Sequence, residues 1–170
     1  MENLQIKHIS NPSGFTEFTE IAQRFCDFIE SGLTFSSPDY LDELREILIT
    51  LYGKAMDLPW VDLKTVEDFH AGMSKSYFEK ILKSIADNLQ DKRYYWDVSN
   101  TSTKSGNTKV VSADLVDNIG DIFKYLKYSL NILNSEKPNC HEVALWQFKF
   151  DFEYQWSAHC INAIRAIHFK

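Results

Sequence analysis

Apolar residues recur at steps of three and four positions along most of this chain. This spacing places them on one side of an α-helix, which completes a turn every 3.6 residues. The first two stripes are Phe15, Phe18, Ala22, Phe25 and Ile29, then Leu41, Leu44, Leu48, Leu51 and Ala55. Six glycines and four prolines are too few for the many turns of a β-sandwich. The pattern therefore predicts an all-α fold.

Two further stripes and one broadly apolar segment complete the helical pattern. The stripes are Phe78, Ile81, Leu82, Ile85 and Leu89, then Leu115, Ile119, Ile122, Leu126 and Leu130. After Pro138 the apolar positions cover a wide arc, which predicts a centrally placed last helix. Its apolar residues are Val143, Leu145, Trp146, Phe148, Phe150, Phe152, Trp156, Ile161 and Ile164. We expect residues 1–170 to form a single-domain antiparallel bundle of about five main helices.

Polar residues before each stripe predict where the helices begin. The expected N-terminal caps are Ser13, Ser37 followed by Pro38 and Asp39, Ser74, Ser112, and Asn139 in a capping box with Glu142. We expect Gly32 to end the first helix in the left-handed conformation. The fourth helix is expected to run to about Asn134.

The segments between these helices carry weaker signals. A short helix is possible at Val66–His70, capped by Thr65. We expect the aromatic run Tyr94-Tyr95-Trp96 to pack beneath the next connection. Residues 99–109 contain no apolar side chain, which predicts a solvated loop.

The sequence lacks the features of an exported or membrane-spanning chain. Its first ten residues do not combine a basic start with an apolar run, so we expect no signal peptide. No apolar window approaches the roughly 20 residues that a membrane helix needs. Cys26, Cys140 and Cys160 show no CxxC spacing and are expected to stay reduced. These features indicate a cytoplasmic protein without a membrane partner.

Charge is distributed unevenly along the chain. Residues 10–73 contain 12 acidic and 4 basic residues, for a net charge of −8, whereas residues 74–170 have a net charge of +2. Acidic surfaces disfavour nucleic acid and favour a basic protein partner. The candidate partner-binding residues are Glu17, Glu20, Asp27, Asp39, Asp42, Glu43 and Glu46. The alternative is that these acids only keep the protein soluble.

No assembled catalytic or metal-binding motif is present. Glu67 and His70 have the Glu-x-x-His spacing of di-iron bundles, but no second such pair exists. His159 and Cys160 are adjacent in a helix, so their side chains point about 100° apart. Phosphate-loop and dinucleotide fingerprints are also missing. We expect no metal, no cofactor and no catalytic residues.

Two groups of polar residues stand out, one on the fourth helix and one on the last. Asp114, Asp117 and Asp121 form an acidic ridge on the fourth helix, where the helix dipole accounts for the first two. The last helix carries Trp156, Asn162, Arg165 and His168. We expect Arg165 to pair with a carboxylate, such as an aspartate of the fourth helix. Structural pairing is the favoured interpretation, and a ligand pocket is the alternative.

Residues 112–121 and 154–168 resemble an uncharacterised bacterial family of helical domains of unknown function. Its members share an S-x-D-L-x-D helix start and a W-x(5)-N-A-L-R-A-L-H-like final helix. Residues 25–30 and 51–55 are also similar, whereas residues 60–110 match poorly. Ser157 stands where the family pattern has glycine. The resemblance implies an all-helical protein and no established activity.

Three functional hypotheses follow. The leading one is a non-catalytic binding domain, most concretely a bacterial immunity protein that neutralises a cognate toxin through its acidic surface. Proteins of that class are similar in size and acidity, which is analogy and not a motif. The alternative is a small enzyme or ligand-binding bundle with a pocket near Asp114, Asp117, Asp121, Trp156, Arg165 and His168. A homodimer with a structural role is the third.

Overall fold

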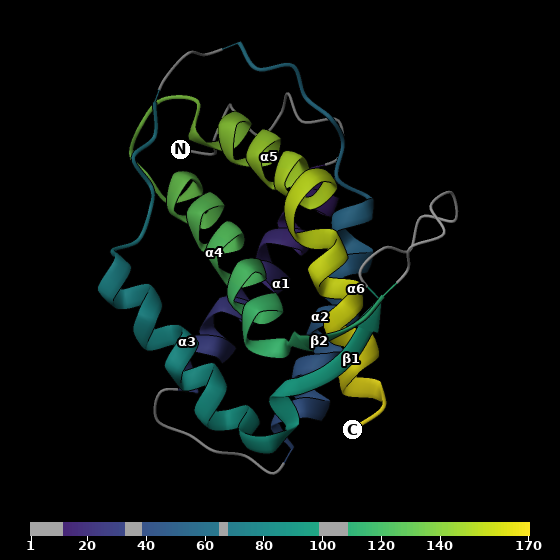
Figure 1. Cartoon of the computed structure of the whole chain (residues 1–170). Helices are drawn as coiled ribbons and strands as arrows, with labels where there is room; N and C mark the ends of the chain where they lie inside the picture. The colour runs from purple at the N-terminus through teal and green to yellow at the C-terminus, as the bar shows by residue number, and fades with distance from the viewer. Residues whose placement is uncertain (1–11, 33–38, 65–67, 99–108) are drawn as a thin grey trace.

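The structure is a computed structural model that describes residues 12–32, 39–64, 68–98 and 109–170. Most of the described chain is helical, as predicted (Figure 1). The helices are α1 (Pro12–Ser31), α2 (Tyr40–Met56), α3 (Lys75–Leu89), α4 (Leu115–Leu133), α5 (Cys140–Asp151) and α6 (Ser157–His168). A 3₁₀ turn (Gln90–Arg93) follows α3, and a π-helical turn (Phe152–Trp156) joins α5 to α6.

Helix α4 is the central element of the bundle. It packs against α1, α3, α5 and α6, while α2 packs against α1 and α6 (Figure 1). All five residues of its predicted stripe are buried. Gly120 allows α3 to come close, since a Cβ there would lie 2.4 Å from Leu82 Cδ2. The predicted helical bundle is therefore confirmed, with α4 in the place expected for the last helix.

The last helix is more exposed than its apolar arc suggests. One side of α5 and α6 faces α4 and α2, but Tyr154 and Ile161 leave 66% and 50% of their surface in solvent. The π-helical turn inserts extra residues per turn, so Phe152 and Trp156 both reach the core with ring centroids 5.1 Å apart. The last helix is therefore contacted on several sides, as predicted, while its outer side is exposed to solvent.

A two-stranded antiparallel ribbon was not predicted. Strand β1 (Tyr94–Val98) pairs with β2 (Val110–Asp114), with Trp96 opposite Ser112. Tyr94 and Trp96 are exposed and only Tyr95 is half-buried, so the expected packing of this aromatic run was wrong. Alternate side chains of a strand point to opposite faces, which explains why Tyr95 lies on a different face of the ribbon from Tyr94 and Trp96.

Among the helix starts predicted within the described residues, Ser74 and Asn139 occupy the cap positions of α3 and α5, whereas Ser13 and Ser112 lie at other positions. Ser74 caps α3 by accepting a hydrogen bond from Tyr77 N at 3.3 Å. Ser112 lies in β2, and Asp114 instead caps α4 by accepting from Val116 N at 2.9 Å. Ser13 lies inside α1, which begins at Pro12. Asn139 precedes α5 in the left-handed region (φ 60°) without a capping bond from its side chain.

Other boundary predictions have mixed outcomes. Glu142 accepts from Lys64 N at 2.8 Å and does not complete a capping box. No described glycine has a positive φ, so Gly32 does not end α1 in the way predicted. Residues 68–70 are not helical. Ser37, Pro38, Thr65, Val66, Glu67 and residues 99–108 lie outside the described residues.

Within the described segments, no helix is long and apolar enough to cross a bilayer.

Candidate protein-binding surface

Helices α1 and α2 carry the acidic residues that the sequence singled out for a partner. Ion pairs join the two helices: Glu17 binds Lys54, and Glu43 lies 3.7 Å from Arg24. Within α2, Asp42 binds Arg45 at 2.9 Å. Several of the predicted acids therefore have a cation of the same chain beside them. These cations are already included in the net charge of −8 for residues 10–73, so the ion pairs change the distribution of charge on this surface and not its net value.

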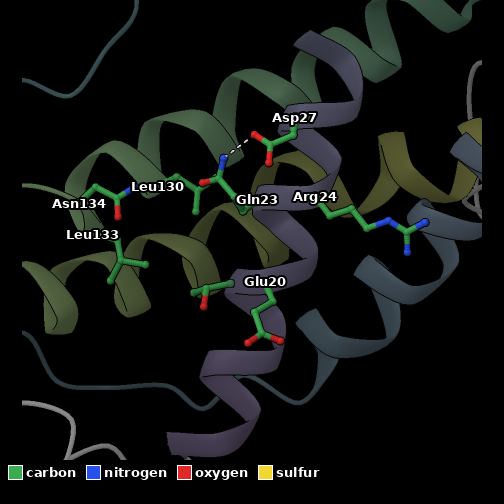
Figure 2. Close-up of a pocket in the computed structure, with 8 residues that line it drawn as sticks. Glu20, Gln23, Arg24, Asp27, Leu130, Leu133 and Asn134 are labelled. Atoms are coloured by element: carbon green, nitrogen blue, oxygen red, sulfur yellow. Dashed lines mark hydrogen bonds between the residues drawn. The ribbon is translucent and has the colours of Figure 1, made fainter. Parts of the chain in front are cut away.

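A groove between α1 and the C-terminal end of α4 contains two of the predicted acids (Figure 2). Its volume is about 470 Å³. The lining residues are Thr19, Glu20, Gln23, Arg24, Asp27, Leu130, Leu133 and Asn134. The two leucines come from α4 and supply an apolar wall, while α1 supplies most of the polar groups. Polar and apolar lining of this kind suits a protein side chain with an apolar stem and a charged end.

The carboxylates of this groove are not neutralised within the described part of the chain. Asp27 Oδ1 accepts a hydrogen bond from the neutral Gln23 Nε2 at 2.7 Å, and Glu20 has no ion pair there. Arg24 points toward α2, where it faces Glu43 (Figure 2). By contrast, the next acid along α1, Glu30, binds Lys127 of α4 at 2.6 Å. The groove is therefore acidic.

The predicted aspartate ridge lies at the start of α4, where each member has a different environment. Asp114 accepts two hydrogen bonds from Arg93 Nε, at 3.2 and 3.1 Å, and also binds Arg93 Nη2. Asp121 Oδ2 lies 3.5 Å from His159 Nε2. Asp117 is exposed, and its pKa is raised by partial burial and by the charges of Asp114 and Asp121. Asp114 has an ion pair with Arg93 and Asp121 lies beside His159, whereas Asp117 has no ion pair within the described ranges.

A polar network extends this ridge to α6 and β1. Asn118 Nδ2 donates to the Tyr95 hydroxyl at 2.8 Å, and Asn118 Oδ1 lies 2.9 Å from His159 Nδ1. Because an amide oxygen only accepts, His159 Nδ1 carries the hydrogen in this bond. Sequence reasoning missed Tyr95, Asn118 and His159 as one group. The spacing of Asn118 and Asp121 on one helical face was the available signal.

The residues predicted on the last helix differ in their surroundings. Arg165 Nη2 donates to Asp97 Oδ1 of β1 at 2.6 Å, so its expected partner on the fourth helix was wrong. His168 lies at the exposed end of α6. Trp156 is fully buried, and Asn162 is half-buried. Of the six residues of the alternative pocket, Arg165 and His168 line one groove between α2 and α6.

Among the described cysteines and histidines, Cys140 Sγ lies 3.4 Å from His141 Nδ1. Cys160 is buried and donates to Leu48 O at 3.6 Å, and burial raises the pKa of its thiol to about 12. A thiol with such a pKa is not a thiolate at neutral pH. Within the described ranges, no three His, Cys, Asp or Glu side chains are placed to hold a metal ion. His70 lies 3.6 Å from Asp68, and Glu67 is outside these ranges.

Residues 10–170 match the family described as Domain of unknown function (DUF5063). The chain belongs to this family. The predicted membership of a family of helical domains of unknown function is confirmed. No curated protein matches this DUF5063 chain.

The fold of this DUF5063 chain is similar to that of a solved structure. It resembles protein BF1032 from Bacteroides fragilis with a TM-score of 0.78 and 20% sequence identity, over 92% of this chain and 90% of that one. At this identity the likeness shows the fold alone. In the DUF5063 chain, Asp114, Asp121 and Arg165 of the motifs quoted above connect α4 or α6 to neighbouring elements.

Proposed function

We propose that this protein is a non-catalytic protein-binding domain, and specifically a bacterial immunity protein that neutralises a cognate toxin. The observation that supports this proposal is the groove between α1 and α4, where Glu20 and Asp27 form no ion pair among the described residues and the Arg24 that also lines it pairs with Glu43. A basic side chain of the toxin would enter the groove and bind these carboxylates. Leu130 and Leu133 would pack against its apolar stem.

The surrounding acids support the same proposal in a lesser role. Glu17, Asp42 and Glu43 form exposed ion pairs, which contribute little to stability because both charges are well solvated. Such pairs can exchange partners when a more basic surface approaches. Together with Asp39 and Glu46 they form a rim that would raise the association rate through long-range attraction. The affinity would depend mainly on Glu20 and Asp27.

The test is co-expression with the gene immediately upstream of the one that encodes this chain. If the upstream product arrests growth, the wild-type chain should restore it and the Glu20→Lys/Asp27→Lys variant should not. A matched control is Glu79→Lys/Asp87→Lys, which makes the same charge change at exposed positions of α3. An upstream product without toxicity, or rescue that survives the groove reversal, would refute the proposal.

The alternative function, a small enzyme or ligand-binding bundle, is favoured by one different observation. Asp121 lies beside His159, and Asp117 has a raised pKa nearby, so a proton donor and acceptor are close together. Arg165, which pairs with Asp97 of β1, and His168 line a different groove, between α2 and α6. Asp121→Asn separates the interpretations. A fall in melting temperature indicates structural bracing, whereas unchanged stability with lost ligand binding supports the alternative.

A further inference from the structure

A second groove lies between α2 and α6, away from the acidic groove. Its volume is about 370 Å³. Ile49 and Tyr52 line it from α2, and Ile161 and Ile164 line it from α6. Ile49 is 53% exposed, so these isoleucines are only half covered by the chain's own packing. Apolar side chains that meet in an open groove indicate a docking surface more strongly than single exposed residues do.

The charged residues of this groove are all basic. They are Arg45, Arg165 and His168, and no carboxylate lines the groove. Asp42 and Asp97, which pair with the two arginines, lie outside the lining. Each guanidinium has five N–H donors, and each uses a single nitrogen, Nη2, for its aspartate. Both arginines can therefore bind a further carboxylate.

We propose that the α2/α6 groove binds an acidic amphipathic helix of another protein. Apolar residues one turn apart on that helix would fill the space between Ile49 and Ile161. Its flanking carboxylates would bind Arg45, Arg165 and His168. This is the helix-in-groove mode of recognition, in which apolar side chains at i, i+3 or i+4, and i+7 enter the groove.

A second copy of this chain is a poorer occupant than a different protein. The acidic helix α1 has the required charge, but none of the large exposed apolar residues in the described ranges belongs to α1. Another copy could therefore satisfy the arginines without filling the apolar floor. The inference goes beyond the proposed function, because this groove is opposite in charge to the α1/α4 groove and selects a different partner.

The experiment uses the full chain and a labelled synthetic peptide of about 18 residues, long enough for partial helicity. The peptide has leucines along one helical face and glutamates on both flanks, and a matched peptide has glutamine at every glutamate. Fluorescence anisotropy measures both affinities. We expect the glutamate peptide to bind at least about tenfold more tightly, since charge-assisted hydrogen bonds are stronger than neutral ones.

Two groove variants and two controls make the test specific. Ile161→Lys and Arg45→Glu should each weaken the glutamate peptide about tenfold or more. Val110→Ser removes an exposed apolar residue of β2, outside the groove, and should leave the affinity unchanged. Glu20→Lys should also leave it unchanged, which separates this proposal from the α1/α4 groove. Circular dichroism verifies that each variant is folded.

Four outcomes would overturn the inference. They are no binding of the glutamate peptide, equal affinity for the glutamine peptide, full affinity in the folded groove variants, and a groove occupied by something else. If a second copy of the chain occupies the groove, light scattering would show a dimer that Ile161→Lys dissociates. Alternatively, vesicles of anionic lipid would bind in place of the peptide and lose binding in the same variants.

Discussion

The carboxylates near the two ends of α4 differ in the partners that they have within the chain. At its N-terminal end, Asp114 is bound by Arg93 and Asp121 lies beside His159. Near its C-terminal end, the carboxylates of Glu20 and Asp27 lie in the groove without an ion pair among the described residues, since Arg24 pairs with Glu43. Bound charges stabilise the fold, whereas uncompensated charges are available to a partner. Under the proposed function, we expect a partner to bind near the C-terminal end of α4, whereas the carboxylates at its N-terminal end contact other parts of the chain.

Asp151 is a buried carboxylate that lies near the C-terminal part of α4. It is 3% exposed at the end of α5, near the buried Ser129 of α4. Gln147 Nε2 donates to its Oδ1 at 2.9 Å, whereas its Oδ2 has no hydrogen-bond partner in the described part of the chain. Burial raises its pKa from 3.8 to about 6. The ionised form is therefore a cost to the folded state at neutral pH.

The largest expected effect is a gain in stability from Asp151→Asn. The folded pKa exceeds the unfolded value by about two units, so the penalty grows as the pH rises from about 4 to about 6 and is complete above that range. At pH 8, removal of the charge should add about 2–3 kcal/mol to the free energy of unfolding. Well below pH 3.8 the carboxyl is protonated in both the folded and the unfolded state, so the gain should vanish. Chemical denaturation at the two pH values measures it, and a gain independent of pH would contradict the account.

The second prediction concerns the N-terminal end of α4, where removal of an aspartate should lower the free energy of unfolding instead of raising it. Asp114→Ala removes the cap of α4 and the partner of the partly buried Arg93, and should cost about 2 kcal/mol. The matched control is Asp117→Ala, three residues further along α4. Asp117 has no bound cation and a raised pKa, so its loss should change stability by less than about 0.5 kcal/mol. Thermal melts of both variants measure the two losses of stability. Equal losses would contradict the expected difference between Asp114 and Asp117.

The sequence predicted the helices well because their stripes repeat over many residues. The stripes of α1, α2, α3 and α4 all contribute to the core. Caps were predicted less well, because a single polar residue such as Ser112 satisfies the local pattern of a cap and that of a strand end. The five-residue strands β1 and β2 carry too few alternations to stand out beside aromatic residues.

The candidate site could be predicted in part. The acidic character of α1 was visible in its composition, and Glu20 and Asp27 were among the candidate residues. Leu133, which completes the groove from α4, could not be found because no local pattern shows which helices lie side by side. For the same reason Arg165 was assigned a partner on the fourth helix, although Asp97 lies 68 positions before it. The groove and the Arg165–Asp97 pair both depend on contacts between segments that are far apart in the sequence.

A third prediction tests the contact between α6 and the ribbon. Arg165→Ala leaves the largely buried Asp97 carboxylate without its cation. We expect a cost of about 1 kcal/mol, smaller than that of Asp114→Ala because Arg165 is 46% exposed and solvent weakens its pair. Amide exchange in β1 should become faster in this variant. Unchanged exchange in β1 would show that the ion pair does not hold the ribbon.

The smallest expected effect is on stability in the acidic groove itself. Glu20→Gln and Asp27→Asn remove charges that bind no cation among the described residues, so each should change the free energy of unfolding by less than about 0.5 kcal/mol. Urea denaturation of the two variants measures this. A loss above about 1 kcal/mol would mean that these carboxylates serve the fold, which would remove the contrast between the two ends of α4.

The most direct test of acidic-groove recognition is chemical-shift mapping of the isotope-labelled chain during titration with an amphipathic peptide of leucine and lysine. The account predicts that the largest shift changes fall at residues 19–27 and 130–134, and that Glu20→Lys/Asp27→Lys abolishes them while the chain stays folded. Shift changes centred on residues 114–121, or changes that persist after the reversal, would contradict it.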